Sequence, residues 1–218
     1  RTAYASLTAL MISLLLGPWV IAKLRQFQIG QYIQEEAPKN HHGKVGTPTM
    51  GGVLIVISII IPTLLWADLT NLYVWVALVS LLLFALVGFM DDYLKVVNQR
   101  SLGLRVVQKL VLQGLIGLGI AMTLIALKGA NLYSGSLSVP FFKRFTPDMD
   151  LMILGASTFI PLILFTLLVI IGSSNAVNLT DGLDGLAAGL VVIAASALTV
   201  LTYVTGHADF ATYLDLIK

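Results

Sequence analysis

The chain has 218 residues, of which 57% are hydrophobic and only 11% are charged, and its formal net charge at pH 7 is +2. Soluble domains have roughly 45–50% apolar and about 25% charged residues, so this composition excludes an ordinary soluble domain and predicts an integral membrane protein. The few, scattered basic residues exclude a nucleic-acid-binding surface, and the absence of cysteine excludes disulfides and thiolate metal sites.

Six apolar stretches approach or reach the roughly 20 residues that a membrane-spanning helix needs. They predict an all-α fold, a polytopic transmembrane helical bundle, because the backbone of a spanning segment must satisfy its own hydrogen bonds within lipid. We expect one integral membrane domain over residues 1–218. Its expected spans, in chain order, are residues 3–22, 51–66, 73–90, 106–127, 151–172 and 186–204.

The loops between these spans differ in their basic residues. Eight lysines and arginines fall on the side that follows the odd-numbered spans, against five on the other side when both ends of the chain are counted. Positive charge favours the cytoplasmic side, so we expect the odd-numbered loops there. The largest loop on the outer side covers residues 128–150, and its weakly alternating run 137–142 predicts a small hairpin.

The first polar stretch of chemical interest leads into the second span. It reads Lys44-Val-Gly-Thr-Pro-Thr-Met-Gly-Gly and ends at Gly52. Backbone N–H groups, hydroxyls and a cation next to a helix N-terminus favour an anion, so Lys44 and Thr49 are candidate ligands of a phosphate. The alternative is a loop that only caps the helix, with Thr49 as the N-cap.

The second stretch is a pair of adjacent carboxylates, Asp91 and Asp92, where the third span ends. Negative charge at a helix C-terminus opposes the helix dipole, and neighbouring carboxylates repel each other. A divalent metal or a lysine such as Lys44 or Lys95 would relieve this, and carboxylate oxygens suit Mg²⁺ or Mn²⁺ better than zinc. The alternative is a solvated interfacial pair balanced by nearby lysines.

The third stretch joins the last two spans and reads Asn-Ala-Val-Asn-Leu-Thr-Asp-Gly-Leu-Asp-Gly. Polar side chains recur in it at every third position, namely Asn175, Asn178, Asp181 and Asp184. In a helix these groups would lie along one face, whereas a break at the glycines would gather them on a tight turn. The alternative is an ordinary solvated loop between helices.

All three stretches fall on the predicted cytoplasmic side. Together they offer carboxylates, amides, a hydroxyl and a lysine, a set that suits a metal-bound pyrophosphate. No ionisable residue falls at the middle of a predicted span, which argues against an ion-coupled transporter. The sequence therefore predicts an interfacial site that joins a water-soluble phosphate compound to a lipid.

These same residues resemble a known family. The motifs Gly46-Thr-Pro-Thr-Met-Gly-Gly, Gly88-Phe-Met-Asp-Asp-Tyr-Leu-Lys and Asn175-Ala-Val-Asn-Leu-Thr-Asp-Gly-Leu-Asp-Gly-Leu are similar to those of the phospho-N-acetylmuramoyl-pentapeptide transferases. That family is a branch of the polyprenyl-phosphate N-acetylhexosamine-1-phosphate transferases. The adjacent Asp pair is shared across the superfamily, whereas the first and third motifs favour the muramoyl branch.

The resemblance implies a Mg²⁺-dependent enzyme of the bacterial cytoplasmic membrane, with its active face in the cytoplasm. Such an enzyme transfers phospho-N-acetylmuramoyl-pentapeptide from UDP-N-acetylmuramoyl-pentapeptide to undecaprenyl phosphate and releases UMP. It implies Asp91 and Asp92 as the catalytic pair, and Asn178 as a metal ligand. It also suggests a homodimer. The substrate-binding residues that it implies are Lys44, Thr49, Asn175, Asn178, Asp181 and Asp184.

The family is expected to have about ten spans, with a further essential Asp and a His-rich stretch in its later loops. Neither motif occurs in these 218 residues, so we expect a fragment that lacks a short N-terminal piece and the C-terminal third. On this view the principal Mg²⁺ ligand lies beyond residue 218, and the fragment alone is inactive.

Two other functions stay open at this point. A sibling enzyme would transfer N-acetylglucosamine-1-phosphate to the same lipid, and the nucleotide sugar that it accepts would distinguish it. A non-enzymatic membrane scaffold would instead tolerate Asn in place of Asp91 or Asp92. A transporter would be supported by a charge at the middle of a span or by an inverted repeat, and the sequence has neither.

Overall fold

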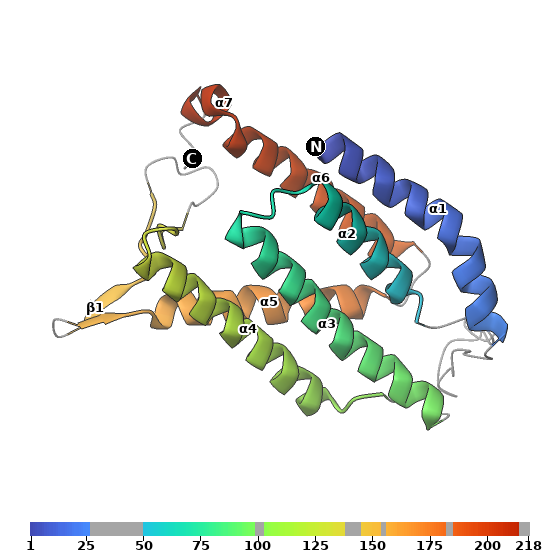
Figure 1. Ribbon diagram of the computed structural model, residues 1–218. Helices are drawn as coiled ribbons and strands as arrows, with labels where there is room; N and C mark the ends of the chain where they lie inside the picture. Colours follow the sequence, from blue (N-terminus) through green and yellow to red (C-terminus); the bar gives the residue numbers. More distant parts are fainter. Residues whose placement is uncertain (27–49, 99–102, 138–144, 154–155, 182–184, 214–218) are drawn as a thin grey trace. The chain divides into compact units, whose positions relative to one another are not determined.

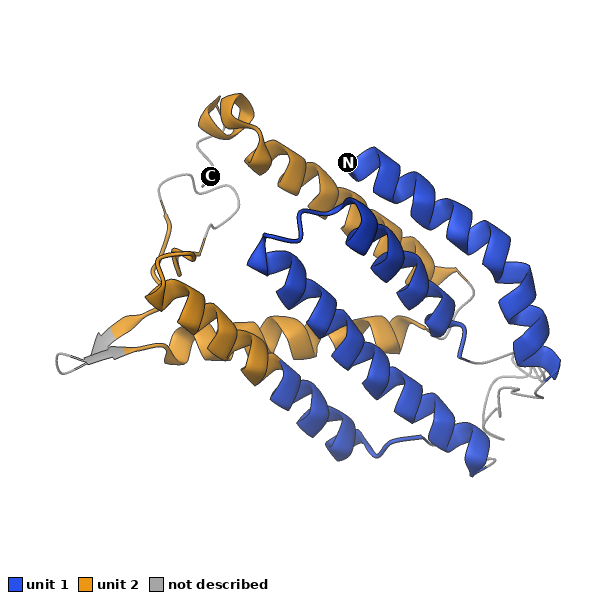
Figure 2. Ribbon diagram, in the orientation of Figure 1, with its two compact units in different colours: residues 1–116 blue, residues 117–218 orange. Residues whose placement is uncertain are grey.

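The computed structural model describes residues 1–26, 50–98, 103–137, 145–153, 156–181 and 185–213. The chain forms two compact units, residues 1–116 and 117–218, and the boundary between them falls within one helix, α4 (Val106–Gly129) (Figures 1 and 2).

Unit 1 consists of α1 (Thr2–Gln26), α2 (Gly52–Trp66), α3 (Leu72–Val97) and the first part of α4. α1 packs along α2, where Gly17 is buried and a side chain at that position would meet Leu54 at 3.7 Å. Small residues allow such close packing between helices in lipid. Near the start of α1 the indole Nε1 of Trp66 donates to the Thr8 hydroxyl at 3.1 Å, and the Trp66 ring stacks on Tyr4.

A short, hydrogen-bonded turn joins α2 to α3. The Asp68 carboxylate accepts hydrogen bonds from the Thr70 N–H and hydroxyl, and the Asn71 side chain accepts from the Tyr73 N–H as the N-cap of α3. An Asn at this position satisfies an N–H that the helix leaves without an internal partner. The start of α3 is therefore fixed at Leu72.

Unit 2 contains the end of α4, the strands β1 (Leu151–Ile153) and β2 (Ala156–Thr158), and three helices. The helices are α5 (Ile160–Thr180), α6 (Leu186–Gly206) and the short α7 (Ala208–Tyr213). A side chain at Gly117 of α4 would lie 2.9 Å from a methyl group of Leu167, so the glycine permits α4 and α5 to pack closely.

The expected fifth span, residues 151–172, is wrong at both ends. β1 and β2 form an antiparallel pair in which Leu151 is opposite Thr158, and the helix runs instead from Ile160 to Thr180. Pro161 explains this start, because proline disrupts a helix interior but is favoured in the first turn, where its missing N–H costs nothing. The hairpin expected at residues 137–142 falls largely outside the described residues.

The described helices confirm a polytopic, helical membrane protein. Five of them are long and apolar enough to cross a membrane, and α2 is a shorter apolar helix of 15 residues. Large apolar side chains face outward along them, with Leu168 71% and Val192 64% exposed. In water such a surface would aggregate, whereas hydrocarbon is a favourable surrounding for it.

An ion pair closes the loop between α4 and the hairpin. Just after α4 ends at Gly129, the left-handed backbone of Asn131 lets the Leu132 N–H donate to the Leu127 carbonyl at 2.9 Å. The Lys128 ammonium then lies 2.7 Å from the Asp150 carboxylate, beneath Gly135, where a Cβ would clash with the lysine side chain. The hydrogen bond from Lys128 holds the pKa of Asp150 below its ordinary value of 3.8.

This pair predicts a pH-dependent contribution to stability. Because folding lowers the pKa of Asp150, its stabilising effect is complete above pH 3.8 and is lost as the pH falls through the lower, folded-state pKa. Asp150→Asn should therefore lower the melting temperature at pH 7, and the difference from the wild type should shrink towards pH 3. Thermal unfolding of the detergent-purified full-length protein measures this, and an undiminished difference at low pH would contradict it.

Candidate active site at the end of helix α3

Asp91 and Asp92 lie within α3 and not at its end. The sequence placed the end of this span at Met90, but the helix continues to Val97, with Asn98 as its C-cap. Asp91 follows Leu72 by 19 positions, about 28 Å along a helix that rises 1.5 Å per residue. Since the hydrocarbon core of a membrane is about 30 Å thick, we expect the carboxylates to lie near the membrane–water interface opposite the Asp68 turn.

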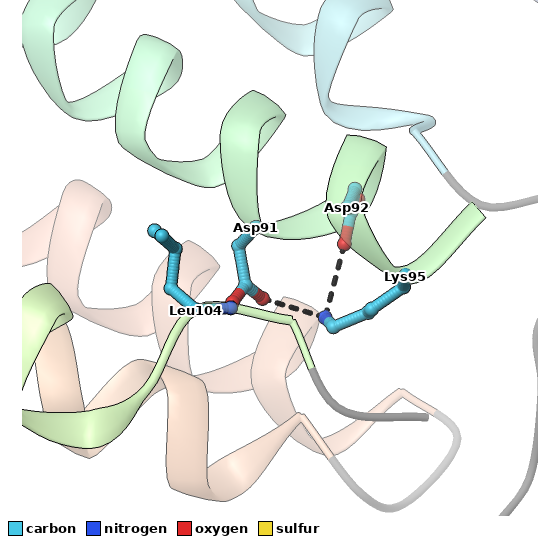
Figure 3. A network of polar contacts seen from close by, with 4 residues as sticks. All are labelled: Asp91, Asp92, Lys95 and Leu104. Atoms are coloured by element: carbon cyan, nitrogen blue, oxygen red, sulfur yellow. Dashed lines mark hydrogen bonds and ion pairs between the residues drawn. The ribbon is translucent and has the colours of Figure 1, made fainter. Parts of the chain in front are cut away.

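Lys95 pairs with both carboxylates. Its ammonium lies 2.6 Å from Oδ2 of Asp91, four residues earlier, and 3.1 Å from Oδ1 of Asp92, three residues earlier (Figure 3). Side chains at these two spacings are neighbours on a helix surface. The expected cationic partner is thus found in Lys95, and the pairing explains why α3 continues past two adjacent negative charges.

The two carboxylates have different surroundings. The side chain of Asp91 is 14% exposed, and its Oδ1 accepts a further hydrogen bond from the Leu104 N–H at 2.8 Å. The side chain of Asp92 is 30% exposed, and Lys95 is the one partner that the described residues give it. Asp91 is therefore held on two sides, while Asp92 is more open to a ligand. Sequence reasoning did not identify Leu104, because a backbone contact across a loop leaves no signal in residue type.

In unit 2 the third polar stretch is divided between a helix and its end. Asn175 and Asn178 belong to the last turns of α5, and Asp181 is its C-cap. The Asn175 side-chain amide donates to the Ile171 carbonyl at 2.8 Å, within its own helix. The helical interpretation thus holds for the two asparagines, and α5 ends before Asp181.

Gly185 supplies the break before α6. Its φ of +81° lies in the left-handed region, which a residue with a side chain adopts only at a cost, and its carbonyl accepts from the Gly189 N–H at 2.8 Å. This glycine therefore starts α6 at Leu186. Asp184, Lys44 and Thr49 lie outside the described residues, and the expectation that all these groups share one face stays a prediction.

The site contains carboxylate oxygens, the type of ligand that Mg²⁺ prefers. Among the described residues no three His, Asp or Glu side chains gather into a metal cluster. However, Mg²⁺ is commonly bound by one or two carboxylates together with substrate phosphates and water. Asp92 is the more exposed carboxylate of the pair, so it fits such a site better than Asp91, which has a donor on each oxygen.

Two family models match this chain. A model of glycosyl transferase family 4 matches residues 74–217, which include Asp91, Asp92 and the third polar stretch. A second model, phospho-N-acetylmuramoyl-pentapeptide-transferase signature 1, matches residues 44–56. The first of these covers about two thirds of the chain.

Curated relatives match along the whole chain. Proteins of Koribacter versatilis and Solibacter usitatus, each described as phospho-N-acetylmuramoyl-pentapeptide-transferase, are 56% identical over 224 residues, which cover 100% of this chain and 59% of the relative. A protein of the same description from Desulfatibacillum aliphaticivorans is 51% identical over 216 residues, with 99% of this chain and 57% of the relative covered. The chain thus spans less than two thirds of these relatives' length.

Proposed function

Because this chain belongs to glycosyl transferase family 4 and to the phospho-N-acetylmuramoyl-pentapeptide transferases, we propose that the protein transfers phospho-N-acetylmuramoyl-pentapeptide from its UDP derivative to undecaprenyl phosphate. The products are UMP and the first lipid-linked precursor of peptidoglycan. The observation that carries this proposal is the carboxylate pair near the C-terminal end of α3, a long apolar helix, with Lys95 as its counter-charge.

The position of the pair suits a reaction between a lipid and a soluble nucleotide. An oxygen of the lipid phosphate attacks the β-phosphorus of the donor, the bond from that phosphorus to the bridging oxygen breaks, and UMP leaves. A carboxylate of the Asp91–Asp92 pair takes the remaining proton of the lipid phosphate and makes its oxygen a better nucleophile. A carboxylate can also act as a covalent nucleophile here, and both routes need it ionised.

Mg²⁺ belongs to this proposal. Asn178 would contribute an oxygen ligand, together with the pyrophosphate of the donor, and the more exposed carboxylate of Asp92 also suits this ion. The ion would neutralise charge on the phosphates as the bond to UMP breaks. The remaining residues that we propose for substrate binding are Lys44, Thr49, Asn175, Asp181 and Asp184. We place the active face in the cytoplasm of a bacterium, and a homodimer is part of the same proposal.

The test uses the full-length protein that contains this chain, purified in detergent. UMP release is measured with UDP-N-acetylmuramoyl-pentapeptide and undecaprenyl phosphate, with and without Mg²⁺. We expect release that requires both substrates and the metal. Release with UDP-N-acetylglucosamine alone would instead establish the sibling activity. No release with either donor from a folded sample would overturn the proposal and favour a transporter or scaffold.

A further inference from the structure

We propose that Gly103 is a positioning residue, which allows the backbone N–H of Leu104 to reach Asp91 and fix the direction of its carboxylate. This inference rests on the proposed function, because it gives the two carboxylates different tasks in that reaction. It is carried by the contacts between the loop that precedes α4 and the last turns of α3.

The Asp91 carboxylate is held from two different elements. Oδ1 accepts the Leu104 N–H at 2.8 Å, and Oδ2 lies 2.6 Å from the Lys95 ammonium, on the other side of the group (Figure 3). A carboxylate with a donor on each oxygen cannot turn about its side-chain bonds without losing one of them. Hydrogen bonds to a charged acceptor are also stronger than neutral ones, so this orientation is well defined.

Gly103 makes the approach of the loop possible. A Cβ at this position would lie 2.5 Å from the Asp91 carbonyl oxygen and 2.8 Å from its Cγ, and it would also clash with Oδ1. The carbonyl belongs to the backbone of α3 and cannot move aside as a flexible side chain would. An alanine must therefore push the loop away from α3, which lengthens or breaks the hydrogen bond from Leu104.

The same loop is fixed to α4 on its other side. The Arg105 N–H donates to the Gln108 side chain at 3.1 Å, and the Arg105 carbonyl accepts from the Lys109 N–H at 3.0 Å. This arrangement caps the first turn of α4, whose positive end also favours a nearby carboxylate. A displacement of Gly103 therefore also displaces the Leu104 N–H, and Oδ1 of Asp91 loses this donor.

The consequence concerns the rate of the chemical step more than the binding of substrate. A reacting group that is misplaced by about 1 Å can cost on the order of a hundredfold in rate. The nucleotide part of the donor would still bind, because Gly103→Ala replaces none of the residues that we propose for substrate binding. We therefore expect kcat to fall while KM for the nucleotide donor stays nearly constant.

The first experiment measures kcat and KM for UMP release by the full-length enzyme with Gly103→Ala. Its matched control is Gly114→Ala on α4, where a Cβ meets no described atom within 4 Å. We expect Gly103→Ala to lower kcat about tenfold to a hundredfold, with KM for the nucleotide donor within about threefold, at a temperature where both variants are folded. An unchanged kcat, or a rise in KM without a fall in kcat, would overturn the inference.

A second experiment does not depend on activity. Hydrogen exchange of the backbone amides in the 103–105 segment is measured in the full-length protein with Asp91→Ala and, separately, with Asp92→Ala. We expect faster exchange only with Asp91→Ala, because Asp91 alone accepts the Leu104 N–H. Equal exchange in both variants would overturn the inference. If the wild type releases no UMP but the exchange differs as expected, the contact stands and the proposed function fails.

Discussion

Asp91→Asn in the full-length protein should lower kcat for UMP release by about a hundredfold to ten-thousandfold, the usual contribution of a positioned general acid or base. Asparagine has nearly the same shape, but it cannot accept the proton of the lipid phosphate. It also replaces one oxygen by an NH₂ group, which donates and does not accept, so one of the two donors, Leu104 or Lys95, loses its acceptor. The chemical step and the orientation of the side chain are therefore lost together.

The matched control is Asp68→Asn, which removes the same charge at the opposite end of α3. Asp68 accepts its hydrogen bonds from Thr70 within the turn and has no part in the proposed reaction. The control should keep its activity, and both variants should elute as folded protein. Full activity of Asp91→Asn would show that this carboxylate is not catalytic.

Lys95→Met should have the second-largest effect, a fall in kcat of roughly tenfold to a hundredfold. Lys95 makes two charge-assisted hydrogen bonds, each typically worth about 1.5–3 kcal/mol, and partial exposure to solvent lowers this value. Without the ammonium, the adjacent carboxylates repel each other and compete for the same proton. One carboxylate then tends to hold a proton, and both lose the contact that orients them.

Two further variants separate charge from packing. Lys95→Arg keeps the positive charge and should recover part of the lost kcat, although its planar group cannot reproduce the contacts of an ammonium. Lys23→Met, on the exposed last turn of α1, removes a lysine far along the chain and should change nothing. Wild-type kcat in Lys95→Met would contradict the role of this lysine as the counter-charge.

The helices that cross the membrane were largely predictable, because lipid requires long apolar runs and these are visible in composition alone. The start of α5 was not. Residues 151–158 are as apolar as a span, and a short apolar run does not distinguish a strand from a helix. Pro161 was the available signal, since its preference for a first helical turn places the start of α5 next to it.

The candidate site was predictable only in part. The spacing of Lys95 from Asp91 and Asp92 is visible in the sequence, and it is the signal that α3 continues beyond Met90. The contact of Leu104 with Asp91 was not predictable, because it joins a backbone N–H to a side chain 13 residues away. Such a contact depends on the path of a loop, which residue types do not determine.

The length of α3 ties the carboxylate pair to the thickness of the bilayer. Asn71 fixes one end of this helix, and the carboxylates follow at a constant distance along its axis. In a thicker membrane the same helix would hold the pair closer to the hydrocarbon. In a thinner membrane the helix would tilt, or the pair would extend further into the headgroup region. The phosphate of the proposed lipid substrate, a polyprenyl phosphate, lies at the depth of the lipid headgroups. The thickness of the surrounding membrane would therefore determine how closely this phosphate approaches the carboxylate pair.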